Sequence, residues 1–290
     1  MSKLKSSFNQ ASLIRYEFAR HIIQSCPIEL GDFIALTGSV ALGVADEHSD
    51  IDLCFYATNL PDRSSITLWI QSLNPQYILP ELDDKLAFIC QLDPFTVELS
   101  WQTIDETEKT LQDLLDGKVV SRLAGMEAWN ISRALPLRQG EWFTNWSAKL
   151  SVYPDVVQKG IIMACSTFWK YPHRVEMLWT LAKRKQAFAL NQWIMADIDD
   201  ALRIICASNR KWEPDWKNLR HIVSELGYTP DYLVERVNAI FEYPTLQKRT
   251  QSALEFISDV LRLVPSHYDV SVQLKNIMTS LHQHIGPVSN

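Results

Sequence analysis

Two aspartates, Asp50 and Asp52, stand one residue apart in a run whose other positions are apolar. Side chains at i and i+2 of a β-strand point to the same side, so the two carboxylates share one face. Ile51, Leu53 and Phe55 alternate with them and face a core on the opposite side. Like charges held this close repel unless a cation lies between them, and Mg²⁺ prefers hard oxygen ligands. The run therefore predicts a half-buried strand that begins with a candidate metal site.

A Gly-Ser pair precedes these aspartates, and ten residues separate Ser39 from Asp50. A turn at Gly38 and Ser39 offers backbone N–H groups and a hydroxyl to an anion. Either element alone is typical of a surface turn with solvated side chains. Their order, their spacing and the strand patterns on both sides instead favour a site for nucleotide phosphates.

Glu98 is the best candidate for a third carboxylate. In residues 95–101 the apolar side chains alternate with polar ones, and this places Glu98 on the polar face of a half-buried strand. Glu81, Asp83 and Asp84 compete for the same role, but they stand in a polar connection that we expect to face solvent.

The pattern of elements changes after about residue 105. The first part alternates helices with short apolar stretches, and the second part is almost entirely of helical periodicity. The predicted strands are 33–36, 50–56, 87–92 and 95–101. The predicted helices are 12–26, 40–43, 64–73, 106–115, 174–190, 193–208, 215–226, 230–241, 246–263 and 270–285. We place the domain boundary within 117–125, which gives domains 1–120 and 121–290.

Composition limits the class of protein. The 290 residues are 47% hydrophobic and 21% charged, as in soluble globular proteins. No apolar run approaches the roughly 20 residues of a membrane-spanning helix. Five scattered cysteines are typical of free thiols in a reducing cytoplasm. A net charge of −6 argues against broad binding to nucleic acid. We therefore expect a cytoplasmic protein without a membrane partner.

Residues 37–53 resemble the signature of the DNA polymerase β-like nucleotidyltransferase superfamily: an apolar residue, Gly, Gly or Ser, a gap of about ten, and Asp-apolar-Asp. Within it the chain is most similar to antibiotic nucleotidyltransferases such as the aminoglycoside adenylyltransferases. Leu42 departs from the pattern, since many relatives carry a basic residue there. The resemblance implies an α/β plus α fold, in which a small mixed β-sheet nucleotidyltransferase domain is followed by a helical substrate-binding domain.

The resemblance also implies roles for the residues of the motif. Gly38 and Ser39 would hold the β- and γ-phosphates of a nucleoside triphosphate. Asp50 and Asp52 would ligate Mg²⁺. Glu98 would match the third carboxylate, which ligates metal or accepts the proton of the acceptor hydroxyl.

A basic loop at residues 207–217 is the second candidate site. The resemblance implies that Lys217 contacts the triphosphate, with Arg210 and Lys211 as rivals. A protein of net charge −6 must supply local cations for such a ligand. The alternative is a solvated basic turn between two helices.

Asp197 and Asp200 share a helix face by their spacing. That face would attract a cationic acceptor if it lined a cleft. We instead expect a solvated acidic first turn of a helix that starts near residue 193.

These observations predict Mg²⁺-dependent transfer of AMP, or another nucleoside monophosphate, from ATP or another NTP. The predicted acceptor is a hydroxyl of a small molecule such as an aminoglycoside or lincosamide, which would make the protein an antibiotic-resistance enzyme. Two alternatives stay open: nucleotidylation of a protein or RNA, and a catalytically silent nucleotide-binding module. Relatives often pair so that two chains build one site, and a homodimer is therefore possible.

Overall fold

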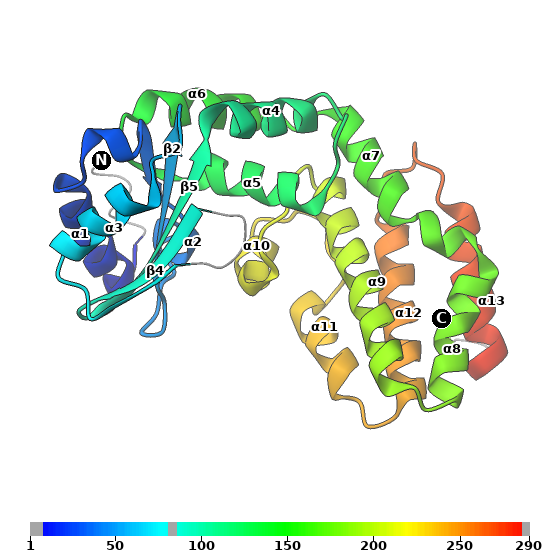
Figure 1. The fold of residues 1–290 in the computed structure, drawn as a ribbon. Helices are drawn as coiled ribbons and strands as arrows, with labels where there is room; N and C mark the ends of the chain where they lie inside the picture. Colours follow the sequence, from blue (N-terminus) through cyan, green and yellow to red (C-terminus); the bar gives the residue numbers. More distant parts are fainter. Residues whose placement is uncertain (1–7, 81–85, 286–290) are drawn as a thin grey trace. The chain divides into compact units, whose positions relative to one another are not determined.

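The computed structural model describes residues 8–80 and 86–285, and six strands in these residues form one mixed sheet (Figure 1). The strands are β1 (Phe33–Leu36), β2 (Ile51–Ala57), β3 (Tyr77–Pro80), β4 (Leu86–Leu92), β5 (Phe95–Thr103) and β6 (Leu135–Arg138). Their order is β3-β4-β5-β2-β1-β6. β2 and β5 are parallel, and the other neighbours are antiparallel. The predicted α/β plus α fold with a mixed sheet is confirmed.

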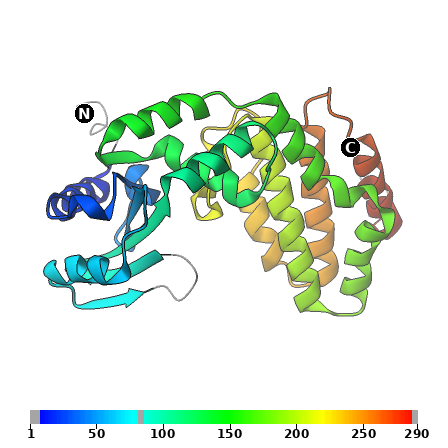
Figure 2. The same cartoon turned by 45° about the horizontal axis from the view of Figure 1, so that its top comes forward.

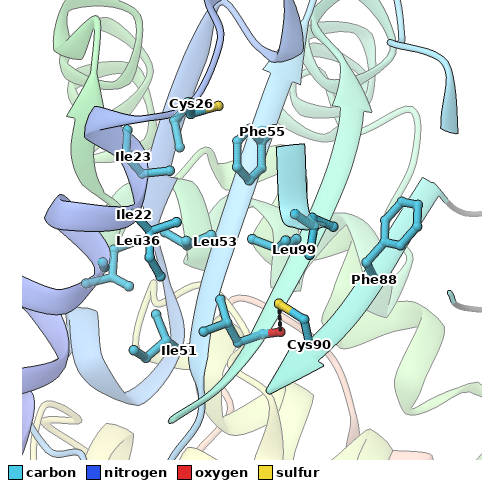
Figure 3. Close-up of a cluster of buried hydrophobic side chains, with 14 of the residues drawn as sticks. Ile22, Ile23, Cys26, Leu36, Ile51, Leu53, Phe55, Phe88, Cys90 and Leu99 are labelled. Carbon is cyan, nitrogen blue, oxygen red and sulfur yellow. Dashed lines mark hydrogen bonds between the residues drawn. The ribbon is translucent and has the colours of Figure 1, made fainter. Parts of the chain in front are cut away.

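One face of the sheet carries the core of this part of the chain (Figure 3). Ile51, Leu53 and Phe55 of β2 are fully buried there, as their alternation predicts. Helices α1 (Gln10–Gln24) and α3 (Arg63–Ser72) cover this face with apolar side chains such as Ile22 and Ile70. The opposite side chains of β2 are thereby directed away from this core.

The opposite face is covered in part by aromatic packing. Helix α6 (Gly140–Leu150) places Trp142 against Phe33 and Tyr56, at centroid distances of 5.3 and 4.9 Å. Glu108 of α4 (Ile104–Leu115) accepts hydrogen bonds from the indoles of Trp142 and Trp146. These rings pack where Phe33 of β1 pairs with Tyr56 of β2.

Two strands and several helices differ from the sequence expectation. β3 and β6 were not predicted, and both are edge strands. β3 is largely exposed, and β6 is a four-residue strand that contains Pro136, so both give a weak strand pattern. The helices α5 (Arg122–Arg133), α6 and α7 (Asp155–Cys165) were also not predicted.

Six helices of the second part form a bundle around α9 (Ala187–Ser208) and α12 (Leu246–Arg262), which lie side by side (Figures 1 and 2). α7, α8 (Pro172–Lys183) and α12 pack on α9. α11 (Leu233–Glu242) and α13 (Ser271–Ile285) pack on α12. The apolar side chains of α12 between Ala253 and Leu261 are buried in this bundle.

Two predicted helices are corrected. The helix expected at 174–190 ends at Lys183, and α9 starts at Ala187 after a turn in which Lys185 has φ +56°. The helix expected at 215–226 is only the 3-10 turn Trp216–Asn218 and the short α10 (Leu219–Val223). In both cases apolar residues keep their helical spacing across a turn. The spacing predicts which residues are buried, but it does not show where the helix ends.

By their internal contacts the residues fall into two compact units. The first combines Met1–Asp113 with Glu127–Val152, and the second combines Leu114–Met126 with Tyr153–Asn290. The predicted division at residue 120 stays a prediction. Among the described helices, none has both the length and the apolar character that a membrane span requires.

Candidate functional site

The three predicted carboxylates meet at one place on the sheet. Asp52 and Glu98 are direct neighbours in the parallel register of β2 and β5. Asp50 stands just ahead of β2, and one ligand oxygen each of Asp50, Asp52 and Glu98 lies within 4.8 Å of the others. All three residues are half-buried. Three carboxylates at this spacing are a hard-oxygen donor set of the kind that Mg²⁺ binds.

Gly38 lies directly against this cluster. The Thr37 N–H donates to the Asp52 carbonyl at 3.0 Å, which fixes the end of β1 beside β2. Gly38 has φ +65°, and a Cβ added to it would lie 1.8 Å from Oδ2 of Asp52. The Gly-Ser turn and the carboxylates are therefore in contact, and any larger side chain at residue 38 would displace a carboxylate.

Helix α1 holds the connection between the turn and the aspartates. The guanidinium of Arg15, which is only 6% exposed, donates to the carbonyls of Ser49 at 2.8 Å and Glu47 at 3.3 Å. Asn9 donates to the Ala45 carbonyl at 2.8 Å. These bonds fix the backbone that enters Asp50.

Arg15 is a site-positioning residue that the sequence reasoning missed. An arginine on an amphipathic helix is expected to lie on the solvent-exposed face. Its real partners are backbone carbonyls about 30 residues away, which no local pattern reports.

Next to the carboxylates, the same face of the sheet holds a small polar layer. The Cys54 sulfur lies 3.5 Å from the hydroxyls of both Thr37 and Ser100. Burial raises the pKa of Cys54 to about 11, so the thiol stays neutral. Farther along β2, the Tyr56 hydroxyl donates to Glu127 at 3.4 Å. Glu127 is a further carboxylate on this side of the sheet that sequence reasoning did not single out.

The competing carboxylates Glu81, Asp83 and Asp84 lie outside the described residues.

The loop at 209–217 has two kinds of residue. Lys217 is exposed at the 3-10 turn, and Arg210 pairs with Asp155 and donates to the Tyr153 carbonyl. Glu213, by contrast, is fully buried and accepts from Arg203 at 2.9 Å. Triphosphate contacts by Lys217 and Arg210 stay predictions. The hydrogen bond between Glu213 and Arg203 attaches the loop to α9.

The expectation for Asp197 is wrong. Asp197 is 2% exposed and lies in the middle of α9, because this helix begins at Ala187 and not near residue 193. It accepts from Arg174 at 2.9 Å and from the Trp169 indole at 3.1 Å. Burial raises its pKa to about 6, although the Arg174 charge opposes this shift. Asp200 is half-buried one turn further along the same helix.

Residues 22–119 match the family model described as a nucleotidyltransferase domain, and this range contains Gly38, Ser39 and the three carboxylates. The match confirms the prediction of a nucleotidyltransferase with its domain of that type in the N-terminal part of the chain. Among solved structures, the chain is similar to a nucleotidyltransferase-like protein from Exiguobacterium sibiricum 255-15, with 13% identity and a TM-score of 0.38. That similarity covers 95% of this chain and 77% of the other. A comparison with curated proteins finds no match.

Proposed function

We propose that the protein transfers a nucleoside monophosphate from a nucleoside triphosphate, preferably ATP, to a hydroxyl of a small molecule. The observation that carries the proposal is the contact between Gly38 and a cluster of three carboxylates on β2 and β5. Transfer of a nucleotidyl group needs a place for polyphosphate beside a place for divalent metal. The proximity of the Gly38 turn to the three carboxylates supports this function.

The donor set supports Mg²⁺ as the metal. Asp50, Asp52 and Glu98 offer only oxygen ligands, and their oxygens lie within 4.8 Å of one another. Bound there, Mg²⁺ would supply charge neutralisation for the phosphates and polarise the phosphoryl oxygens. Removing any one carboxylate would weaken the site, since each offers one ligand atom.

The chain's own residues contribute positioning. The hydroxyl and backbone N–H groups of the Gly38-Ser39 turn would hold the leaving phosphates through hydrogen bonds. Arg15 holds the backbone before Asp50, so the two aspartates keep a fixed spacing. A fixed site of this kind accelerates transfer by orientation and needs no covalent intermediate.

Glu98 is suited to the acceptor side of the reaction. As the third carboxylate it would either ligate metal or accept the proton that leaves the acceptor hydroxyl. The acceptor is proposed as a hydroxylated antibiotic of the aminoglycoside or lincosamide type, in line with the resemblance of residues 37–53. Pyrophosphate would leave from the opposite side of the α-phosphorus.

The test is pyrophosphate release. Purified protein is incubated with Mg²⁺, each of the four common NTPs and a panel of aminoglycosides and lincosamides. We expect acceptor-dependent pyrophosphate release and an acceptor whose mass increases by one nucleotidyl group. The D52N variant should lose at least about 100-fold in rate, since a metal ligand is removed.

The matched control is Glu47→Gln, which removes an exposed carboxylate from the same connection. It should keep wild-type activity. Label that appears on a protein or RNA instead of a small acceptor would reject the small-molecule acceptor. NTP binding without transfer to any acceptor would instead identify a silent nucleotide-binding module.

A further inference from the structure

A pocket of about 690 Å³ opens in the helical unit, apart from the residues of the nucleotidyltransferase site. It lies between the segment around η2 (Thr167–Lys170), the start of α8 and the middle of α9. This volume is within the range of small-molecule sites. Its lining combines exposed aromatic side chains with a buried acidic floor.

The rim of the pocket is aromatic. Phe168 and Tyr171 are 58% and 50% exposed, although both are large and apolar enough to be buried elsewhere. Trp193 forms one wall, and the Arg174 guanidinium covers its ring at 4.0 Å. Exposed rings around a hollow favour a ligand with an apolar body.

The floor holds a buried carboxylate whose hydrogen bonds are incomplete. Asp197 uses Oδ1 for Arg174 and Trp169, while its buried Oδ2 has no hydrogen-bond partner among the described residues. A buried oxygen in this state costs free energy unless a donor reaches it. A ligand that donates a hydrogen bond would remove this cost.

Carboxyl groups outnumber guanidiniums around the floor. The described residues that pair along α9 comprise four carboxylates and three guanidiniums: Asp197, Asp199, Asp200 and Glu213 with Arg122, Arg174 and Arg203. Each guanidinium has one close carboxylate, at 2.9 to 3.2 Å. Asp200 also lines the pocket and accepts a hydrogen bond from the Cys165 thiol. Its nearest guanidinium, Arg203, is 4.0 Å away and is already bonded to Glu213.

We propose that this pocket binds a small organic amine, with its ammonium group against Asp197 and Asp200 and its apolar body between Phe168, Tyr171 and Trp193. The ammonium supplies a hydrogen-bond donor for Asp197 and a positive charge beside Asp200, whose guanidinium partner is 4.0 Å away. Aromatic faces near an ammonium add cation–π attraction. An anion would meet two carboxylates and, of the described residues that line the pocket, a single guanidinium, Arg174, which already pairs with Asp197. A bare metal ion would leave the aromatic rim without a partner.

Burial raises the pKa of Asp197 and Asp200, the arginines oppose this shift, and the neighbouring carboxylates add to it. The binding site is proposed independently of nucleotidyl transfer, and its test does not use turnover.

The test compares three probes of the same shape: 2-phenylethylamine, 2-phenylethanol and phenylacetate. Binding to the full chain is measured by calorimetry and by saturation-transfer NMR. We expect the amine to bind at least about tenfold more tightly than the alcohol, and the anion to bind least. Equal binding of the amine and the alcohol, or no binding of the amine up to about 10 mM, would overturn the proposal.

Two variants locate the probe. Asp200→Asn removes the poorly paired charge and should weaken amine binding by about tenfold while leaving alcohol binding unchanged. Ala196→Trp fills the pocket from an exposed position and should abolish binding of both probes. Asp259→Asn, an exposed carboxylate on α12, is the control and should change nothing. Unchanged amine affinity in both pocket variants would place the probe elsewhere and reject the site.

Discussion

Gly38 occupies a position that no other residue fits, for two separate reasons. Its φ of +65° is unfavourable for side chains other than hydrogen, and a Cβ there would lie 1.8 Å from Oδ2 of Asp52. We expect Gly38→Ala to lower the rate of nucleotidyl transfer by roughly 100-fold or more, because it displaces a metal-site carboxylate. The measurement is pyrophosphate release at saturating substrates. Gly227→Ala is the control, since its Cβ would meet only an ordinary contact at 3.7 Å.

The proximity of Asp50, Asp52 and Glu98 gives a second prediction, on metal linkage. A ligand that binds only the folded state stabilises it by about 2.7 kcal/mol at 100 times its Kd. Mg²⁺ should therefore raise the melting temperature of the wild type, and Glu98→Gln should reduce this increase. Glu47→Gln should retain it. An equal Mg²⁺ response in the wild type and in E98Q would exclude Glu98 from the metal site.

At the residue scale, the sequence predicts a site residue best where its chemical type and its place in a strand pattern agree. Alternation in β2 and β5 was sufficient to bring Asp52 and Glu98 to one face. It could not report that these strands pair in parallel and in register. The sequence also does not predict the partners of Arg15 and Glu213, because these hydrogen bonds join different elements of the fold.

At the element scale, α1 acts as a clamp on the connection that leads into β2. Arg15 is buried with its donors on the carbonyls of Glu47 and Ser49. We expect Arg15→Ala to lower the free energy of unfolding by about 2 kcal/mol or more, and to lower transfer activity as well. Arg20→Ala on the same helix removes an exposed pair with Glu17 and a distant contact with the Tyr16 ring, and should cost less than Arg15→Ala. Chemical denaturation and the pyrophosphate assay measure the two effects.

The attachment of the 209–217 loop to α9 predicts a pH dependence. Burial raises the pKa of Glu213 from 4.5 to about 7, with Arg203 and Arg122 opposing the shift and Asp199 adding to it. The folded state therefore binds more protons than the unfolded state between these values. Stability from this group is fully present below pH 4.5 and is lost as the pH rises toward 7.

The Glu213→Gln variant should lack this slope. The free energy of unfolding of the variant relative to the wild type is then expected to rise from pH 4.5 to pH 7. Denaturation curves at several pH values in this window measure the difference. Asp197 adds a slope of the same sign in both proteins, so it cancels in the comparison. A difference that is flat with pH would reject the raised pKa of Glu213.

The bounds of central strands are easier to predict from the sequence than those of edge strands. β1, β2, β4 and β5 were predicted within about two residues, because each is buried on at least one face. The edge strands β3 and β6 lack that signal. The misplaced start of α9 also explains why Asp197 was expected in a solvated first turn.

At the scale of the whole molecule, the carboxylate site belongs to one compact unit and the amine pocket to the other. Mg²⁺ without nucleotide should therefore slow amide hydrogen exchange in residues 37–57 and 95–103, where its proposed ligands lie. Exchange in α12 and α13 should stay unchanged. Hydrogen-exchange mass spectrometry with and without Mg²⁺ measures this. Uniform protection of all helices would contradict a local metal site.

The parallel pairing of β2 with β5 has a consequence for how the protein folds. Residues 52 and 98 lie 46 positions apart, and α3, β3 and β4 come between them. Closing a loop of this length costs more chain entropy than forming the hairpin of β4 and β5. We therefore expect the hairpin to form first, and the acidic cluster to assemble only when the hairpin docks on β2. A metal ion that needs all three carboxylates would bind late on the folding pathway. We therefore expect Mg²⁺ to slow unfolding more than it accelerates folding.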